Sequence, residues 1–136
     1  MATYTKFNSF VEAVAEKVHN LGSDQLKIAL TNSAPSASNT QLSDLTEISY
    51  TNCSSRNVTT SSSTQTSGTY KLVCADLTLT ASGGSVGPFR YVVLYNDTAT
   101  NDELIAYYDY GSSITLNDGD SFVVDFDGTN GVHTLA

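Results

Sequence analysis

Residues 89–95, with the sequence FRYVVLY, decide the fold because they carry apolar side chains on both faces of an extended strand. Strands that are apolar on both faces are buried on both faces, so we expect 89–95 to be the central strand of a sheet. Segments on either side of it alternate between apolar and polar residues, as half-buried strands do. The other predicted strands are 25–30, 70–74, 76–80, 104–110, 113–116, 121–127 and 132–135.

About eight short strands, spaced roughly 8–12 residues apart, predict a mainly β single domain. The fold class that we expect is an antiparallel β-sandwich or a jelly-roll-like fold, with one N-terminal α-helix packed on it. The length of 136 residues fits one domain, at 8–136, behind an N-terminal arm at 1–7. We expect this arm to lie along a neighbouring subunit and to become ordered on binding.

The helix is expected at about residues 8–20, where apolar residues recur at spacings of three and four. Ser9 and Glu12 have the spacing of a capping box, and Gly22 suits the left-handed position beyond the helix. Lys17 and His19 would complement the negative end of the helix dipole. The expected apolar stripe comprises Phe7, Phe10, Val11, Val14, Val18 and Leu21.

The segments between the first strands are mostly polar. Residues 31–40 form a loop by composition. Leu42, Leu45 and Ile48 follow at a spacing of three, which fits either a short helical turn or an irregular covering segment. Residues 49–68 are nearly all Ser, Thr, Asn and Gln, which fits either a flexible loop or a polar edge strand around 58–65. The Ser-Gly pair at 67–68 predicts a turn.

The formal net charge is −8, and the acidic excess lies entirely after residue 90. Arg90 is the last basic residue, and the acids that follow it are Asp97, Asp102, Glu103, Asp109, Asp118, Asp120, Asp125 and Asp127. Such a surface repels phosphate, so we expect neither nucleic acid nor an anionic membrane as a partner. The first twenty residues lack the pattern of a targeting signal, and no apolar run is long enough to span a bilayer.

We expect no enzymatic activity and no cofactor, because residues that carry catalysis are sparse. The two histidines, His19 and His133, belong to no recognisable motif with a Ser or Cys nucleophile. Paired acids can hydrolyse glycosides, but a chain of this size without Trp has little material for a sugar-binding cleft. Cys74 has the position of a small core residue, and a disulfide with Cys53 is disfavoured in a protein made in the cytosol.

The tightest set of candidate metal ligands is Asp125, Asp127 and Asn130, which offer oxygen donors of the kind that Ca²⁺ prefers. A third carboxylate or a bidentate Glu does not follow at the offset that a calcium loop requires. We therefore interpret the two acids as solvated residues on one face of a strand that ends in a turn, and we expect no metal site.

A cluster of tyrosines is the one feature that indicates a partner, because Tyr is enriched in protein interfaces and on sugar-binding surfaces. Tyr91, Tyr95 and three further tyrosines fall within twenty residues. On a strand, Tyr107 faces one side and Tyr108 and Tyr110 the other, so one set can lie outside the core. The alternative is that these rings border a small core. The residues that we predict to contact a partner are Tyr4, Phe7, Tyr107, Tyr108 and Tyr110.

Three stretches cover most of the chain: 5–35 (TKFNSFVEAVAEKVHNLGSDQLKIALTNSAP), 87–98 (GPFRYVVLYNDT) and 104–135 (LIAYYDYGSSITLNDGDSFVVDFDGTNGVHTL). Together they resemble a family of small virion structural proteins encoded by tailed bacteriophages. Residues 49–66 depart from the pattern, since this chain has TNCSSRNVTTSSST where the family carries Gly-rich turns. The resemblance implies a virion context and no site residues. Within that context the expected role is a capsid decoration (cement) protein on the outside of the head shell.

The expected partner is then the major capsid protein or another virion protein, with the chain assembling as a dimer or trimer. The expected localisation is the virion, after synthesis in the host cytoplasm. An outer position suits the negative charge, which packaged nucleic acid would repel. Two other classes remain open. One is a tail- or fibre-associated component, which would be present in fewer copies per particle than a protein of the head shell. The other is a carbohydrate-binding host-attachment module that uses the tyrosines.

Overall fold

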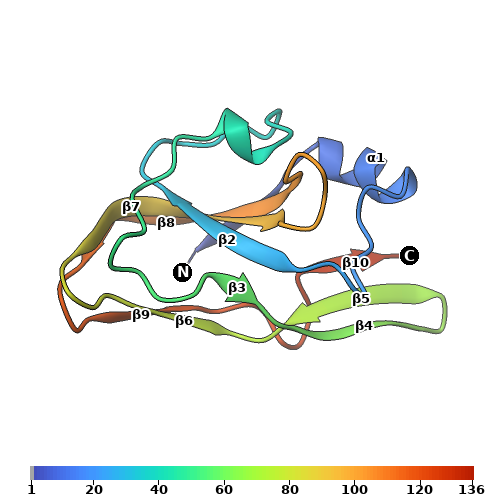
Figure 1. Cartoon of the computed structure of the whole chain (residues 1–136). Helices are drawn as coiled ribbons and strands as arrows, with labels where there is room; N and C mark the ends of the chain where they lie inside the picture. The colour runs from blue at the N-terminus through green and yellow to red at the C-terminus, as the bar shows by residue number, and fades with distance from the viewer. Residues whose placement is uncertain (1) are drawn as a thin grey trace.

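A five-stranded sheet forms the middle layer of the computed structural model, which describes residues 2–136. Its strands lie in the order β1-β8-β7-β2-β3, and each neighbouring pair is antiparallel. They span Thr3–Lys6 (β1), Leu104–Leu116 (β8), Val86–Asn96 (β7), Leu26–Thr31 (β2) and Asn57–Val58 (β3). The prediction of a mainly β fold built from antiparallel strands is confirmed (Figure 1).

Two smaller antiparallel sheets form a second layer against the inner face of the five-stranded sheet (Figure 1). One has the order β10-β5-β4, and the other pairs β6 with β9. These strands span Thr60–Thr66 (β4), Thr69–Cys74 (β5), Leu77–Thr80 (β6), Ser121–Val124 (β9) and His133–Leu135 (β10). The two layers make a β-sandwich, with one α-helix packed beside it.

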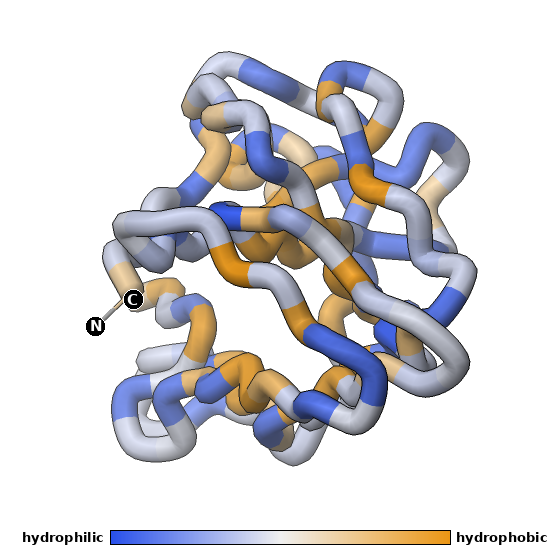
Figure 2. The backbone as a smooth tube through the Cα atoms, turned by 90° about the vertical axis from the view of Figure 1, so that its left-hand side faces the viewer, coloured by the Kyte–Doolittle hydropathy of each residue, from blue (hydrophilic) through white to orange (hydrophobic). Residues whose placement is uncertain are grey.

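The main hydrophobic core lies between the two layers, and Figure 2 shows hydrophobic residues concentrated toward the middle of the molecule. Ile28 and Leu30 of β2 point into this core, whereas Ala29 points to the opposite face, as the period of two along a strand requires. The second layer contributes Leu72, Leu79 and other fully buried side chains. Close packing of these chains holds the layers together.

A second, smaller hydrophobic cluster covers the outer face of the five-stranded sheet. Its buried members are Phe7, Ala29, Val93, Tyr95 and Leu104. Leu42 and Leu45 pack on them from a segment that contains the 3₁₀ helix η1 (Leu42–Asp44), so the structure supports the helical turn. Because this segment and the core enclose the sheet from both sides, β7 is buried on both faces. The prediction that 89–95 is the central strand is confirmed.

Strand β8 is longer than predicted, because 104–110 and 113–116 belong to one continuous strand. The pairing with β7 changes register where Phe89 lies opposite Ile114 and Tyr91 lies opposite Asp109. An advance of two residues along β7 therefore corresponds to five residues along β8. The extra residues of β8 form a bulge that contains Gly111 (φ 84°). The prediction of two separate strands at 104–110 and 113–116 is therefore wrong.

The helix α1 spans only Ser9–Ala15, so the prediction of a helix over 8–20 is wrong in length. It ends in a Schellman motif: the N–H of Lys17 donates to the Val14 carbonyl and that of Val18 to the Ala13 carbonyl. Lys17 takes the left-handed position (φ 67°) that was expected of Gly22. This early ending turns the chain so that His19 and Leu21 are buried.

The predicted helix cap and apolar stripe also need correction. The N-cap residue is Asn8, and it makes no side-chain capping bond, so the capping box at Ser9 and Glu12 does not form. Phe10 of the stripe is fully buried, whereas Val11 is 49% exposed. Lys17 and His19 lie beyond the helix and do not complement its dipole.

The expected N-terminal arm is a strand of the sheet in the part that the structure describes. Residues 3–6 form β1, which pairs with 106–109 of β8. One edge of this segment thus pairs within the chain, and its other edge has no strand partner among residues 2–136. Met1 lies outside the described residues.

Of the two interpretations of 49–68, the structure supports the polar strand. Residues 60–66 form β4, which pairs with β5 through the turn at Ser67 (φ 50°) and Gly68 (φ 86°). Backbone hydrogen bonds with β5 compensate for the lack of apolar side chains in this strand. Cys53 and Cys74 are both free, and Cys74 is 2% exposed in the core, as predicted.

Candidate functional site

Three of the predicted partner-binding residues, Tyr4, Tyr108 and Tyr110, come together in one groove, which we call the tyrosine groove. It has a volume of about 760 Å³ and opens on the side of the sandwich where β1 and β9 lie. Its lining residues are Ala2, Tyr4, Tyr108, Tyr110, Val123, Asp125, Asp127, Gly128, Gly131 and Val132. The groove therefore joins both layers of the fold.

The aromatic rings of the tyrosine groove are held by edge-to-face packing. Tyr4 contacts Tyr108 with ring centroids 5.4 Å apart, and Tyr108 contacts Phe126 at 6.0 Å. Tyr110 packs on Phe122 at 5.1 Å. Tyr108 is only 8% exposed and Tyr110 is half-buried, whereas Tyr4 is 40% exposed, so Tyr4 is the most accessible of the three rings.

Two strand edges beside the tyrosine groove have no strand partner among residues 2–136. β1 pairs only with β8, and β9 pairs only with β6. Tyr4 lies on the first of these strands and Val123, which is 51% exposed, on the second. Open edges present backbone N–H and C=O groups to any chain that approaches in an extended conformation.

The electrostatics of the tyrosine groove combine neutral phenols with carboxylates. Burial raises the pKa of Tyr4 to about 12 and also raises the pKa values of Tyr108 and Tyr110, so all three hydroxyls stay protonated at neutral pH. Asp125 and Asp127 lie in the same lining. The groove therefore attracts cationic or uncharged groups and repels anions.

Asp127 organises the turn between β9 and β10. Its carboxylate accepts hydrogen bonds from the backbone N–H groups of Thr129 (2.9 Å) and Asn130 (2.8 Å) and from Nδ2 of Asn130 (2.8 Å). These bonds, with those of Asn130 first, hold the pKa of Asp127 below its usual value. Asn130 thus donates to Asp127, so the two do not converge as metal ligands. No cluster of three or more His, Cys, Asp or Glu side chains suited to a metal occurs within the described chain.

Phe7 and Tyr107 lie on the other face of the five-stranded sheet, away from the tyrosine groove. Phe7 is fully buried, and its ring packs on Tyr107 at 5.3 Å in the outer cluster. The prediction that Phe7 contacts a partner is wrong, because the chain turns inward directly after β1. Tyr107 is half-buried beneath it.

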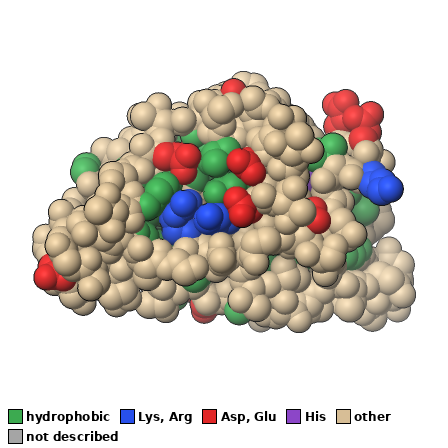
Figure 3. Space-filling view, in the orientation of Figure 1, with side chains coloured by type: hydrophobic (Ala, Val, Ile, Leu, Met, Phe, Trp, Pro, Cys, Tyr) green, Lys and Arg blue, Asp and Glu red, His purple; other side chains and the backbone are tan. Residues whose placement is uncertain are grey.

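A surface hollow that faces the viewer in Figure 3 gathers Lys, Arg, Asp and Glu side chains around hydrophobic ones. Near β2, Arg56 lies over the ring of Tyr50 at 3.6 Å and donates from Nη1 to the Ile28 carbonyl at 2.7 Å. The Tyr50 hydroxyl donates to Glu47 at 2.7 Å. Arg56 is thus held by contacts within the chain, which assigns it a structural role.

Burial shifts the pKa values of the two cysteines and the two histidines in opposite directions. Burial raises the pKa of Cys74 to about 11 and also raises that of Cys53, so both thiols are protonated at neutral pH. Burial lowers the pKa values of His19 and His133. The ring of His133 packs edge-on against Phe10 at 4.7 Å.

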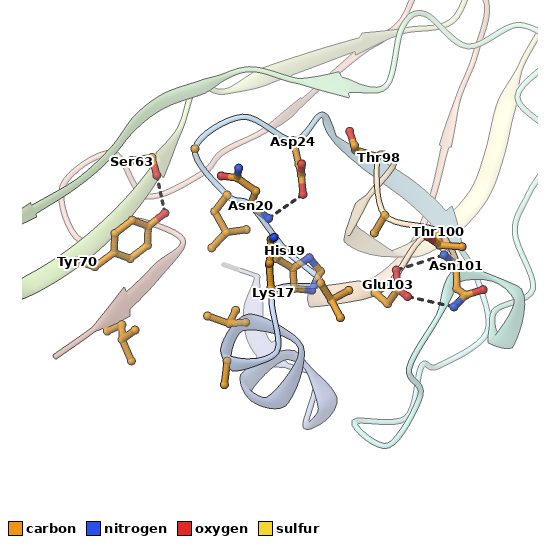
Figure 4. A pocket seen from close by; sticks show the side chains of 17 residues that line it. Lys17, His19, Asn20, Asp24, Ser63, Tyr70, Thr98, Thr100, Asn101 and Glu103 are labelled. Carbon is orange, nitrogen blue, oxygen red and sulfur yellow. Dashed lines mark hydrogen bonds between the residues drawn. The ribbon is translucent and has the colours of Figure 1, made fainter.

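A second concave site, which we call the His19 pocket, was missed by the sequence analysis. It has a volume of about 880 Å³ and lies at the end of the sandwich beside α1 (Figure 4). Its walls come from residues 14–24, from Ser63 and Tyr70 of the β4–β5 hairpin, and from residues 98–103. These segments are far apart in the sequence, and no spacing or motif connects them. The only signal was a histidine close to the expected helix end, which we assigned to the helix dipole.

The fold and the tyrosine groove define a β-sandwich domain with one open side. Comparison of the chain with protein-family models, curated proteins and solved structures finds no match. None of the helices among residues 2–136 has the length and apolar character needed to cross a membrane.

Proposed function

We propose that the protein is a structural component of a tailed-bacteriophage virion, namely a capsid decoration protein bound to the outer surface of the head shell. The observation that carries this proposal is the tyrosine groove between the two open strand edges of β1 and β9. The sequence resemblance to phage virion proteins supplies the context, and the groove supplies a surface for docking. Catalysis and cofactors have no part in the proposed role.

The proposed partner surface is an extended segment of the major capsid protein that carries basic side chains. An extended segment can pair with an open strand edge through its backbone, while its side chains enter neighbouring hollows. Asp125 and Asp127 favour a Lys or Arg in the groove, and the exposed ring of Tyr4 adds a cation–π contact. Charge and edge geometry therefore favour the same kind of partner.

The charge distribution supports a position outside the shell. The net charge of −8 would be repelled by packaged nucleic acid inside the head. We also propose that the protein acts as a dimer or trimer, in which copies meet at symmetry-related positions of the shell. The alternative, a tail- or fibre-associated component, predicts a few to a few dozen copies per particle, whereas a shell protein predicts hundreds.

The test uses purified phage heads that lack the protein, to which the purified full chain is added. The variant Val123→Lys places a positive charge at the exposed edge residue of β9, where it opposes the two neighbouring acids and repels the basic side chains of the proposed partner. We expect it to reduce binding at least about tenfold, which corresponds to about 1.4 kcal/mol. Binding is measured by co-sedimentation, and the copy number follows from the saturation level.

The matched control is Val11→Lys, since Val11 is exposed to a similar extent (49% against 51%) but lies on α1 and not in the groove. This variant should bind like the unmodified protein. Equal loss of binding in both variants would show that added charge alone prevents binding. Full binding by Val123→Lys would exclude the tyrosine groove as the docking surface.

A further inference from the structure

The His19 pocket contains a buried hydrogen-bond donor that lacks an acceptor. His19 is 6% exposed, and its Nε2 has no hydrogen-bond partner within residues 2–136. Figure 4 shows its ring among the side chains that line the pocket, with Asp24 on one side and Glu103 on the other. Buried polar groups in proteins are nearly always satisfied, so an unpaired one calls for an additional partner.

The neighbouring amide determines which nitrogen of His19 carries the proton. Asn96 must point its Oδ1 at the backbone N–H groups of Thr98 and Ala99, from which it accepts hydrogen bonds of 3.0 and 3.1 Å. Its Nδ2 therefore faces His19 Nδ1 at 3.0 Å and also donates to Asp24 at 2.7 Å. Nδ1 accepts this bond, so the proton of the neutral imidazole is on Nε2.

This tautomer excludes several classes of ligand. A metal ion would need the lone pair of Nε2, which is occupied by the proton. An anion would meet the carboxylates of Asp24 and Glu103, which line the pocket. A simple cation would suit those carboxylates but would bring no acceptor for the Nε2 proton. The ligand must therefore carry acceptor and donor groups together without a net negative charge.

The lining of the pocket fits an uncharged molecule with many hydroxyl groups. Exposed polar side chains converge from separate segments, among them Asn20, Thr98, Thr100 and Asn101. An aromatic ring, that of Tyr70, is held by a 2.8 Å hydrogen bond to Ser63 and forms one wall. Sugars combine hydroxyl groups with an apolar ring face, and tyrosine offers a matching apolar surface with a polar tip.

We infer that the His19 pocket binds an uncharged saccharide, with Nε2 of His19 donating a hydrogen bond to a sugar hydroxyl. The carboxylate of Glu103 is already positioned by Asn101, whose N–H and Nδ2 donate to it at 3.3 and 3.2 Å, and it accepts from a second hydroxyl. This activity goes beyond docking on a capsid, because the His19 pocket and the tyrosine groove share no lining residue.

The test is a titration of the isotope-labelled full chain, followed by NMR, with glucose, galactose, mannose, rhamnose and N-acetylglucosamine as separate probes. Spectra of the free protein first establish the tautomer, which should have the proton on Nε2. With at least one sugar we expect saturable shifts of the His19 ring and of the backbone amides of 98–101. The opposite tautomer would overturn the inference, as would a lack of saturable shifts with every sugar.

Two exposed residues of the pocket supply variants that should fold normally. Thr100→Val and Asn101→Ala each remove polar groups from the lining, and we expect binding to weaken about threefold to tenfold, which is what one neutral hydrogen bond contributes. Tyr4→Ala, in the other groove, is the matched control and should leave sugar binding unchanged. Shifts that follow Tyr4 instead of Thr100 and Asn101 would contradict the inference. Because no capsid is used, the result is independent of the proposed docking function.

Discussion

The ring of Tyr4 packs edge-on against the ring of Tyr108, with centroids 5.4 Å apart and an angle of 64° between the ring planes. The two residues are direct cross-strand partners in the pairing of β1 with β8. Tyr108 belongs to the main core, while Tyr4 keeps 40% of its surface exposed. One aromatic pair thus connects the core of the sandwich to the surface proposed for docking.

This pair leads to a prediction about stability. Tyr4→Ala should lower the free energy of unfolding by more than about 1 kcal/mol, since the edge-to-face contact contributes about 0.5–1.5 kcal/mol in addition to the burial of the ring. Tyr4→Phe keeps the ring and should be close to the unmodified protein. Urea unfolding of the two variants measures the difference. Equal destabilisation by both would show that the hydroxyl, and not the ring contact, matters.

The two histidines predict a loss of stability in mild acid. Burial lowers the pKa of His19 in the folded state, with Glu103 and Asp24 opposing this shift, and lowers that of His133 with the help of Lys6. A lowered pKa means that folding favours the neutral ring. The stabilisation is therefore complete above the unfolded pKa of about 6.5 and is lost as the pH falls below it.

Melting temperatures recorded between about pH 7.5 and about pH 5.5 should therefore decrease toward acid, a range in which ordinary carboxylates do not titrate. His133→Phe keeps an aromatic ring against Phe10 but cannot be protonated, so its melting temperature should depend less on pH. A melting temperature that is constant over this range would contradict the assignment of both rings as buried neutral groups.

Gly131 is expected to tolerate no side chain, and Gly119 offers a matched comparison. Both have positive φ angles, 82° and 90°. A Cβ on Gly131 would lie 2.7 Å from the Leu72 carbonyl oxygen, which already accepts a hydrogen bond from Val132, whereas a Cβ on Gly119 would meet nothing within 4 Å. Gly119→Ala should cost about 1 kcal/mol through backbone strain alone. Gly131→Ala should cost clearly more, and similar values from denaturant unfolding would exclude the clash.

Asp109 holds two groups of the sheet in place. Replacing it should therefore cost more stability than replacing its ion-pair partner, Arg90. Its carboxylate accepts from Arg90 at 2.8 and 3.2 Å and from the backbone N–H of Gly111 at 2.8 Å in the bulge of β8. The bonds from Arg90 and Gly111 lower the pKa of Asp109, so this stabilisation is present above the unfolded pKa of about 3.9 and is lost below it.

We therefore expect Asp109→Ala to lower the unfolding midpoint in urea more than Arg90→Ala does. Asp109→Asn retains an oxygen that can accept from Gly111 and should lie between them. If both alanine variants lost the same stability, the hydrogen bond to Gly111 would be without consequence.

The parts of the fold that could be predicted are those in which the side-chain pattern is strong. The central strand at 89–95 was identified because it is apolar on both faces, and the strand that begins at Leu26 because its alternation is regular. Helix length was not predictable, because it depends on Lys17 adopting a left-handed conformation that most residues avoid. The strands β1 and β4 likewise form through backbone pairing with β8 and β5, and their side chains show little alternation of apolar and polar residues.

The candidate site was predictable in part for a related reason. Tyr108 and Tyr110 share a strand face, which a period of two indicates, and Tyr4 was included because of its position near the N-terminus. Phe7 was misassigned, because its burial depends on a cluster assembled from distant segments. The His19 pocket depends on Asn96, whose amide orientation is determined by backbone groups of the following loop. Such a relationship leaves no trace in sequence spacing.

The outer hydrophobic cluster affects how backbone amide protons exchange with solvent. Strand β7 is enclosed by the core on one side and by Leu42 and Leu45 on the other, so water reaches the amides of residues 92–94 from neither face. Deuterium can replace those protons only when the whole domain unfolds, whereas the rim strands β1 and β9 exchange by local fraying. A ligand seated at the rim would thus slow exchange there and leave the innermost amides at the rate set by global unfolding.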